Sequence, residues 1–346
     1  MPALTSSRPT LIDVARVLNP NGSIAEVAAI LQQYNEMLDD IPWYEGNSPT
    51  GNITTIQTSK AAPVLRLLNQ GVVPTKSTTG QIIDACSIIE NRSEVDMNVA
   101  NINGNLKAFR ATQDKPMITG FADALSTYLI YGDTSTDPAQ FNGLATRYFS
   151  LGSTYTTSSQ MIDAGGTGSD NTSIWLVCYG QDKVWGVYPK GTQAGLRFED
   201  LGIQEVITNS TTGAKMRAYV SWMQWLCGIV VADYRSVIRI CNVDMSNLRT
   251  AGDSSDTSAN IMKYMSLALD LLPPGNDFMP VFYMNQEVRG LLRAKMQDKS
   301  NHWLTDAAMT SPTSITRRPS LAFQGVPCRL MNAITKTEAQ ITTATT

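Results

Sequence analysis

The sequence is poor in charged side chains. Asp, Glu, Lys and Arg make up 16% of its 346 residues, against about 25% in an ordinary soluble domain. The net charge of -3 and the pI of about 5.3 provide no basic footprint, which excludes a dedicated nucleic-acid binder. A low charge fraction fits either a neutral surface or a surface that meets other subunits, and composition leaves both open.

The sequence is equally poor in residues for catalysis. Its one histidine, His302, would have to serve any Ser-His-Asp or Cys-His site, and no nucleophile signature lies near it. Multi-ligand zinc sites, HExxH and GxSxG are absent. The glycine run 165–168 lacks the GK[ST] ending of a phosphate loop and predicts a flexible turn. Asp39 and Asp40 are adjacent, so on a helix they point apart and indicate a solvated helix end. We predict no catalytic residue, no metal site and no cofactor.

Five cysteines are present, an odd number with wide spacing and no CxxC pair. This pattern favours buried, reduced thiols in a chain made in the cytoplasm. No stretch approaches the roughly 20 apolar residues of a membrane span, and MPALTSSRPT at the start is unlike a signal peptide. We therefore expect no membrane partner.

Hydrophobic residues make up 42% of the chain, enough for a sizeable core. Helical periodicity and β-prone apolar runs predict the elements. Helices are expected at 10–40, at 93–131 in runs that divide at Thr112, at 259–272, and from Asn285 onward. Strands are expected at 174–177, 184–188, in the apolar run 222–240, at 281–284 and at 326–331. The segments 150–173 and 246–258 read as a surface loop and a polar linker. Mixed elements without strict alternation predict an α+β fold.

Residues 46–85 have a different character, because Gly and Pro interrupt short β-prone runs there. Val64, Leu65, Leu67 and Leu68 lie in the middle with little to pack against. An isolated two-stranded hairpin is marginal in water. We predict a hairpin-like arm whose apolar residues contact another subunit. An ordinary internal hairpin remains the alternative.

Several strings that occur in order are typical of one family. They are NEMLDD at 35–40, WYEGN at 43–47, SEVD at 93–96, YGD at 131–133, FNGL at 141–144, IDAGGTGS at 162–169 and SIW at 173–175. With them the chain resembles, from about residue 10 to 335, the major capsid proteins of tailed bacteriophages. The likeness is to the podophage type, with the Hong Kong-type capsid fold that herpesvirus shells share.

The resemblance implies a division into named parts. These are an N-terminal arm at 1–45, an extended E-loop at 46–85, a P-domain at 86–143 and 214–245 with a spine helix at about 113–131, an A-domain at 144–213 and 246–335, and a C-terminal tail at 336–346. The Thr-rich tail is expected to be frayed. The block around Tyr234-Arg235 precedes the helix–strand–helix unit 259–300, the reverse of the commonest order in this fold, so we expect permuted connectivity.

The resemblance also implies a function. The chain would self-assemble as pentamers and hexamers of an icosahedral shell around double-stranded DNA, in the virion, after assembly in the host cytoplasm. Scaffold, portal and decoration proteins are candidate partners, and contact with the packaged DNA would be non-specific. The alternative is a phage-associated hydrolase or glycan-binding β-protein that uses Trp175, Trp185, Trp222 and Trp225. Against it, Trp222 and Trp225 are spaced as core residues, and no pair of carboxylates can be nominated for sugar cleavage.

Overall fold

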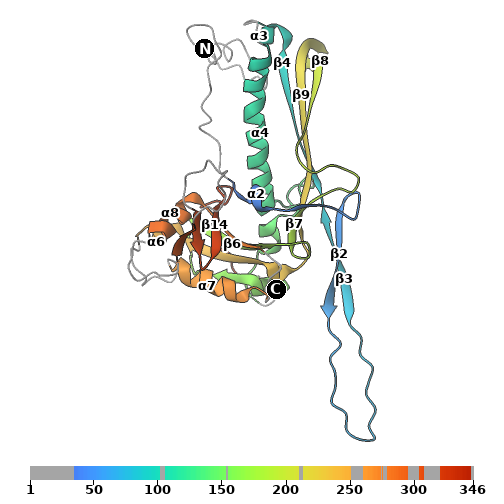
Figure 1. Cartoon of the computed structure of the whole chain (residues 1–346), viewed down its shortest axis with the longest axis vertical. Helices are drawn as coiled ribbons and strands as arrows, with labels where there is room; N and C mark the ends of the chain where they lie inside the picture. Colours follow the sequence, from blue (N-terminus) through green and yellow to red (C-terminus); the bar gives the residue numbers. More distant parts are fainter. Residues whose placement is uncertain are drawn as a thin grey trace.

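A computed structural model describes residues 35–101, 106–152, 155–209, 213–250, 260–273, 275, 279–294, 304–307 and 320–343. Figure 1 shows a body built on a large sheet, a long helix that stands upright beside long strands, and a hairpin that extends away from both. Most of the helical segment expected at 10–40, and His302, lie outside the described residues.

The body is a mixed sheet that brings together strands far apart in the sequence. Its path is β12-β13-β14-β11-β6-β7-β9-β4, and β1, β5, β8 and β10 pair with members of the path. The strands are β1 (Trp43–Glu45), β4 (Ser87–Asp96), β5 (Met161–Asp163), β6 (Asn171–Tyr179), β7 (Val184–Tyr188), β8 (Arg197–Asn209), β9 (Ala214–Val231), β10 (Val237–Asp244), β11 (Met279–Met284), β12 (Leu304–Ala307), β13 (Ser320–Phe323) and β14 (Val326–Leu330). β6 is antiparallel to β10 and β11, whereas β11 and β14 are parallel. The expected strands at β6, β7, β11 and β14 are confirmed.

β6 separates the two main cores. All of its residues are buried. Trp175 and Val177 face one core, and Ile174 and Leu176 face the other. A strand that is buried on both faces tends to be a continuous apolar run without alternating polar residues, which explains the apolar run 174–179.

Helices supply the other side of each core. The first core takes α2 (Met37–Asp40), α5 (Leu144–Arg147) and the C-terminal half of α4 (Leu106–Tyr131). The second takes α6 (Met245–Thr250), α7 (Ile261–Leu271) and α8 (Gln286–Ala294). α7 buries Ile261, Tyr264, Met265 and Ala268, the helical spacing read from the sequence. Helices packed on a mixed sheet confirm the α+β class.

The upright part consists of α4 beside three long strands (Figure 1). β4 pairs with β9 from Ser87↔Cys227 to Asp96↔Ala218, and β8 lines the other side of β9. α3 (Met97–Asn101) connects β4 toward α4.

The arm is a separate two-stranded hairpin of β2 (Gly51–Ser59) and β3 (Thr78–Ala85). Ile53 lies opposite Ile83, and residues 60–77 join the strands without strand structure of their own. Figure 1 shows the hairpin pointing away from the body. The sequence prediction of a hairpin-like arm is confirmed.

The helical interpretation of 93–111 is wrong in its first part. Ser93 and Asp96 lie in β4, because that segment pairs residue by residue with β9. Asp96 instead caps α3, where its carboxylate accepts a hydrogen bond from the N–H of Asn98 at 2.7 Å. The spine helix begins at Leu106, not at 113, and it contains Pro116. Packing of Phe109 in a small core with Val95 favours this earlier start.

The predicted loop and linker are also partly wrong. Residues 150–173 contain a 3-10 turn (η1, Thr156–Gln160), β5 and the start of β6. Gly166 in the glycine run donates its N–H to the carbonyl of Asn242 at 2.9 Å, so the run is held against the sheet. The polar linker begins with α6, because the carboxylate of Asp244 accepts from the N–H of Asn247 at 2.9 Å and caps it.

The apolar run 222–240 is not one strand. β9 ends at Val231, a 3-10 turn (η2, Tyr234–Ser236) follows, and β10 begins at Val237. The segment 214–245, expected as one P-domain block, therefore divides. The first part of β9 pairs with β4 and β8, whereas β10 pairs with β5 and β6 in the body. β8, expected in the A-domain, pairs along β9 beside the helix α4.

Candidate inter-subunit site

The base of the arm is locked to the body through its backbone. Gly51 has a φ of 152°, and a Cβ added there would lie 2.0 Å from the carbonyl oxygen of Asp84, so this position requires glycine. The N–H of Gly46 donates to Tyr188 at 2.8 Å, and the N–H of Cys86 donates to Thr50 at 2.9 Å. Both strands therefore leave the body in a fixed direction.

An ion pair holds the same base from the side of α5. Nη1 of Arg147 lies 2.7 Å from Oδ1 of Asp84, whose side chain is 2% exposed. Nη2 of Arg147 donates to the carbonyls of Asn142 and Ile229, each at 3.1 Å. The guanidinium thus ties β3 to β9 and to the turn before α5. A buried carboxylate needs such a cationic partner, so the pair fixes the end of β3 that lies next to the body.

The tip of the arm, residues 60–77, lies in solvent. Large aliphatic side chains gather there, with exposed fractions from 51% to 102%. They are Val64, Leu65, Leu67, Leu68, Val72 and Val73. Exposed apolar side chains that are contiguous mark an interaction site on a soluble protein. The four residues predicted at an inter-subunit contact are therefore exposed together, and the contact itself stays a prediction.

The charge of the arm has one sign. Between residues 46 and 83 the charged residues are Lys60, Arg66 and Lys76, with no Asp or Glu. A partner surface with exposed carboxylates would therefore complement the tip.

A groove between α4 and β8 is another exposed surface with apolar character. Ile118 and Phe198 are about half exposed on its two sides. The guanidinium of Arg110 binds the carboxylate of Asp200 through two hydrogen bonds, of 2.8 and 2.6 Å. Hydrogen bonding to Arg110 lowers the pKa of Asp200. Aromatic side chains and Arg are enriched in protein–protein interfaces.

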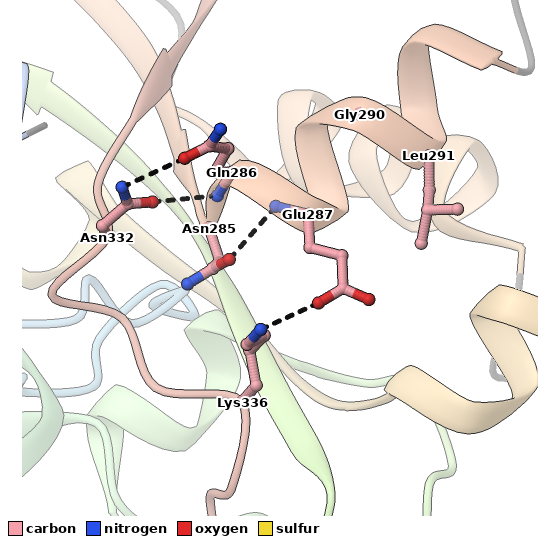
Figure 2. Close-up of a pocket in the computed structure, with 7 residues that line it drawn as sticks. All are labelled: Asn285, Gln286, Glu287, Gly290, Leu291, Asn332 and Lys336. Atoms are coloured by element: carbon pink, nitrogen blue, oxygen red, sulfur yellow. Dashed lines mark hydrogen bonds and ion pairs between the residues drawn. The ribbon is translucent and has the colours of Figure 1, made fainter.

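A polar groove lies where α8 begins (Figure 2). The side chain of Asn285 accepts from the N–H of Glu287 at 3.1 Å and caps the helix, as the sequence predicts. Arg249 and Lys336 both pair with the carboxylate of Glu287 and lower its pKa to about 2. These polar groups bind one another, which favours a structural role for the groove.

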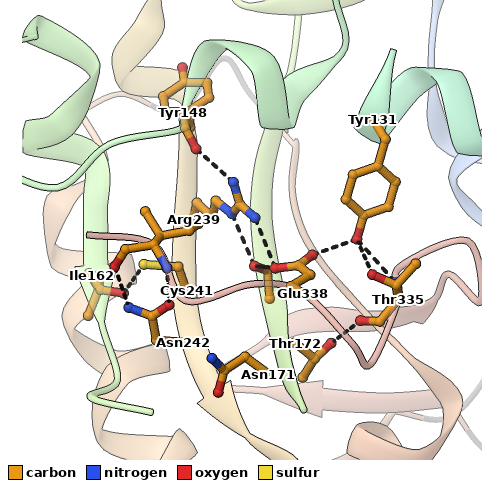
Figure 3. Close-up of polar contacts among 12 residues, drawn as sticks. Tyr131, Tyr148, Ile162, Asn171, Thr172, Arg239, Cys241, Asn242, Thr335 and Glu338 are labelled. Carbon is orange, nitrogen blue, oxygen red and sulfur yellow. Dashed lines mark hydrogen bonds and ion pairs between the residues drawn. The ribbon is translucent and has the colours of Figure 1, made fainter. Parts of the chain in front are cut away.

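The C-terminal tail takes part in a buried polar network (Figure 3). Nη2 of Arg239 lies 2.9 Å from Oε2 of Glu338, and the two side chains are 5% and 7% exposed. Ser173 and Tyr131 also donate to the carboxylate of Glu338. Burial and the nearby carboxylate of Glu338 raise the pKa of Tyr131 far above its ordinary value. The tail through residue 343 is therefore packed, and the prediction that it is frayed is wrong for 336–343.

The sequence reasoning also missed the environment of Asp40. Asp39 is exposed as predicted. Asp40 accepts a hydrogen bond from the Tyr283 hydroxyl at 2.8 Å and lies 3.3 Å from Arg329. Burial raises its pKa, although the bond from Tyr283 and the charge of Arg329 oppose this. Asp40 anchors α2 to β11 and β14 and is not a solvated helix end.

The described residues offer few groups for chemistry. The thiols are free, and all except Cys86 are fully buried. Burial raises the pKa of Cys86 to about 11, so the reactive thiolate is scarce at neutral pH. Across the described ranges, no cluster of three or more His, Cys, Asp or Glu side chains could hold a metal. In the same ranges, no helix has the length and apolar character to cross a membrane.

The tryptophans proposed for glycan binding do not share one surface. Trp175 and Trp185 are buried in separate cores. Trp225 packs on Trp43 with ring centroids 5.8 Å apart. Trp222 and Trp225 lie on strand β9, where a separation of three residues places side chains on opposite faces. Both are only partly buried, and Trp225 packs against the first core, so the expectation that both are core residues holds only in part.

Comparison with known proteins identifies the family. The model of the family "Major capsid protein GP7" matches residues 19–342. The chain belongs to this family of major capsid proteins. Residues 35–101, with the locked arm base, and the strands of the body all fall within the match. A search of curated protein sequences gave no match.

Solved structures agree with the family. A chain in the structure of bacteriophage Epsilon15 is 26% identical, with a TM-score of 0.78 over 99% of both chains. The SrpI encapsulin of Synechococcus elongatus is 11% identical (TM-score 0.43; 67% of this chain, 95% of that chain). The bacteriophage JBD30 capsid is 10% identical (TM-score 0.39; 96% of each chain). The last two are too distant to support an argument.

Family and fold together establish the function at a coarse level. This major capsid protein has the Hong Kong-type capsid fold, forms a viral shell by self-assembly and is a structural component of the virion.

Proposed function

We propose that the tip of the arm, residues 60–77, is the contact through which each subunit binds a neighbour in a closed icosahedral shell. The observation that supports this is the contrast within the arm. Its base is fixed by the Arg147–Asp84 pair, whereas Leu65 and Leu68 at the tip are 102% and 90% exposed. A rigid stem that presents exposed aliphatic side chains needs a partner outside its own chain.

The energy of this contact can be large enough for assembly. Full burial of one Leu or Val side chain stabilises a contact by roughly 1.5–3 kcal/mol. Val64, Leu65, Leu67 and Leu68 together would give several kcal/mol, from which the cost of ordering the tip is subtracted. In a closed shell every subunit gives and receives this contact, so the gain repeats around the shell.

Replacement of the tip tests the proposal. A variant in which residues 60–77 are exchanged for a short Gly-Ser turn keeps β2, β3 and the Arg147–Asp84 pair. We expect a folded, soluble subunit that fails to close stable shells in electron micrographs. A matched control exchanges only the exposed polar residues Gln70, Thr75 and Ser77 for Ser or Ala and keeps the aliphatic side chains. Normal shells from the tip-less chain, or its unfolding, would contradict the proposal.

The shell in this proposal consists of pentamers and hexamers around double-stranded DNA, and it assembles in the bacterial cytoplasm. The acidic pI of about 5.3 supports non-specific rather than dedicated contact with that DNA. Scaffold, portal and decoration proteins are the proposed helpers. Particles from infected cells should protect double-stranded DNA from nuclease, and particles that never contain DNA would contradict this part.

The division into domains is part of the proposal, with amended bounds. The P-domain would include β8 together with β4, α4 and the first part of β9, because these pair or pack with one another. β10 would join the A-domain with β6, β11, α7 and α8, whose side chains share a core. The permuted order of the C-terminal segments stays a prediction.

We propose further that the role is structural only, without catalysis. The buried thiols and the separated tryptophans support this over a hydrolase or a glycan-binding protein. His302→Ala should leave assembly and infectivity nearly unchanged. A large loss of infectivity by a variant that folds normally would reveal a site at this histidine.

A further inference from the structure

The C-terminal segment 332–343, here called the strap, is bonded along its length to the body. Ile334 is fully buried in the first core. The N–H of Glu338 donates to the carbonyl of Asn171 at 2.9 Å, and the N–H of Leu151 donates to Thr342 at 3.2 Å. Asn242 exchanges two hydrogen bonds with the backbone of Ile341, at 2.8 and 2.9 Å. The strap is thus an integral part of the subunit.

The strap binds to β10 at a point where the strand is irregular. The pairing of β10 with β6 shifts between Ile240 and Val243, and Asn242 has a φ of 56°. Asn tolerates this left-handed conformation better than most residues do. A bulge re-aims a side chain out of the regular ladder, and here it turns the amide of Asn242 toward the strap (Figure 3).

The strap also supplies the carboxylate that pairs with a buried cation. Arg239 on β10 is 4% exposed. Its guanidinium lies 4.8 Å from the ring centre of Trp175, donates to Ser173 at 3.0 Å and pairs with Glu338 at 2.9 Å. Without the strap, the charged guanidinium of Arg239 would stay buried and would lose Glu338. Of these contacts, only those with the neutral side chains of Trp175 and Ser173 would remain. Loss of one member of a buried ion pair is strongly unfavourable.

From Arg239 a continuous run of contacts leads to the base of the arm. Nη1 of Arg239 donates to the carbonyl of Tyr148 at 2.8 Å (Figure 3). Tyr148 directly follows Arg147 at the end of α5, and Arg147 pairs with Asp84 in β3. The ring of Tyr148 is fixed as well, because its hydroxyl donates to Tyr234 at 2.6 Å. Packed and hydrogen-bonded groups of this kind can carry coupling between distant sites, and a measurement of the coupling is the test of it.

We propose that the strap is a latch for the arm. When Glu338 docks on Arg239, it holds the Arg147–Tyr148 segment in place, and that segment holds Asp84 and the direction of the hairpin. When the strap is released, the base of the arm loosens. The consequence for shell assembly rests on the proposed function, whereas the coupling of strap to arm within one subunit does not.

Hydrogen–deuterium exchange of the free full-length subunit tests the coupling. Glu338→Gln keeps the shape of the side chain and removes its charge, and Thr337→Ala, at an exposed neighbouring position, is the matched control. We expect faster exchange in Glu338→Gln at the strap, at 142–149 and at the arm base, 46–56 and 80–90. Exchange in α7 should stay unchanged, because α7 packs on the opposite core. Thr337→Ala should match the natural chain throughout.

Faster exchange at the strap with no change at 46–56 and 80–90 would overturn the proposal, and so would an equal increase everywhere including α7. If Glu338→Gln fails to fold, the double variant Arg239→Met/Glu338→Met replaces it, because it removes the docking contact and leaves no unpaired buried charge, and the same readings apply. Shell formation by Glu338→Gln is scored separately. Normal shells from a subunit with a loosened arm base would leave the coupling in place and would contradict its consequence for shell assembly.

Discussion

The tip of the arm and the C-terminal strap are both extended segments, but the tip is exposed and the strap is packed on the body. Both have little regular structure, and both contain aliphatic residues. The tip exposes all of its large aliphatic side chains, whereas the strap buries Ile334 and Glu338. The difference lies in the neighbours of each segment. The strap contacts Arg239, Asn242 and the first core, whereas the tip is surrounded by solvent. Apolar content alone therefore does not decide which segment packs inside its own chain.

The polar contacts of the two segments differ in the same way. At the tip a hydrogen bond between Gln70 and Leu67, at 3.2 Å, closes a local turn. Along the strap, the bonds of Glu338 and Ile341 reach residues more than 90 positions away in the sequence. Long-range bonds of buried groups stabilise the subunit, whereas an exposed local turn does not. The strap should therefore affect subunit stability, and the tip should affect assembly.

The largest stability effect is expected from Glu338→Ala, which leaves Arg239 buried without its carboxylate. Removal of one partner of a buried pair lowers the free energy of unfolding by about 3–5 kcal/mol. Urea unfolding of the isolated subunit measures this loss. The double variant Arg239→Met/Glu338→Met should regain most of it, since no buried charge remains. A loss below about 1 kcal/mol, as is usual for exposed ion pairs, would mean that the strap is solvated.

The sequence predicted the arm but not the strap, for a physical reason. The arm is defined by local signals, namely glycines, prolines and β-prone runs between 46 and 85, and a hairpin needs only neighbouring residues. The strap depends on pairing between Glu338 and Arg239, 99 positions apart. Neither residue has a distinctive neighbourhood in the sequence. The Thr-rich composition of the tail suggested fraying, and tertiary contacts overrode that local signal.

The same reason accounts for the errors in secondary structure. Ser93 and Asp96 have capping-box spacing, yet they lie in β4 because β9, more than 100 residues later, pairs with them. α7 and α8 were predictable, because each has a local cap, at Asn260 and Asn285, and a helical apolar face. Elements fixed by local chemistry can be read from one sequence, whereas elements fixed by distant pairing cannot.

A smaller effect is expected from Asn242→Ala at the other end of the strap. The change removes the two bonds to Ile341 and leaves its partly buried backbone groups unsatisfied, which costs at most about 1–3 kcal/mol. Thermal unfolding should show a lower midpoint than the natural chain, with a smaller shift than Glu338→Ala causes. A loss as large as that of Glu338→Ala would show that the amide of Asn242, and not the ion pair, is the main attachment of the strap.

Near the start of the strap, Lys336→Met should lower the free energy of unfolding only slightly, by an amount that depends on pH. Lys336 and Glu287 are both partly exposed, and such pairs contribute about 0–1 kcal/mol. Because Arg249 and Lys336 lower the pKa of Glu287 from 4.5 to about 2, the contribution is complete above about pH 4.5 and disappears as the pH falls through about 2. Unfolding curves at pH 7 and pH 2 measure this difference. Lys190→Met, at an exposed loop position, is the control and should change stability equally at both pH values.

The smallest effect on the subunit is expected at the tip. Leu65 and Leu68 are almost fully exposed, so the double variant Leu65→Ser/Leu68→Ser removes no contact within the chain. Its free energy of unfolding should stay within about 0.5 kcal/mol of the natural value, as for other surface changes. Urea unfolding of the free subunit checks this, with Gln70→Ser as the control. The same double variant should assemble far less efficiently, because each lost Leu removes roughly 1.5–3 kcal/mol from every inter-subunit contact. A clear loss of subunit stability would mean that the tip packs on its own chain, and the contrast with the strap would then be wrong.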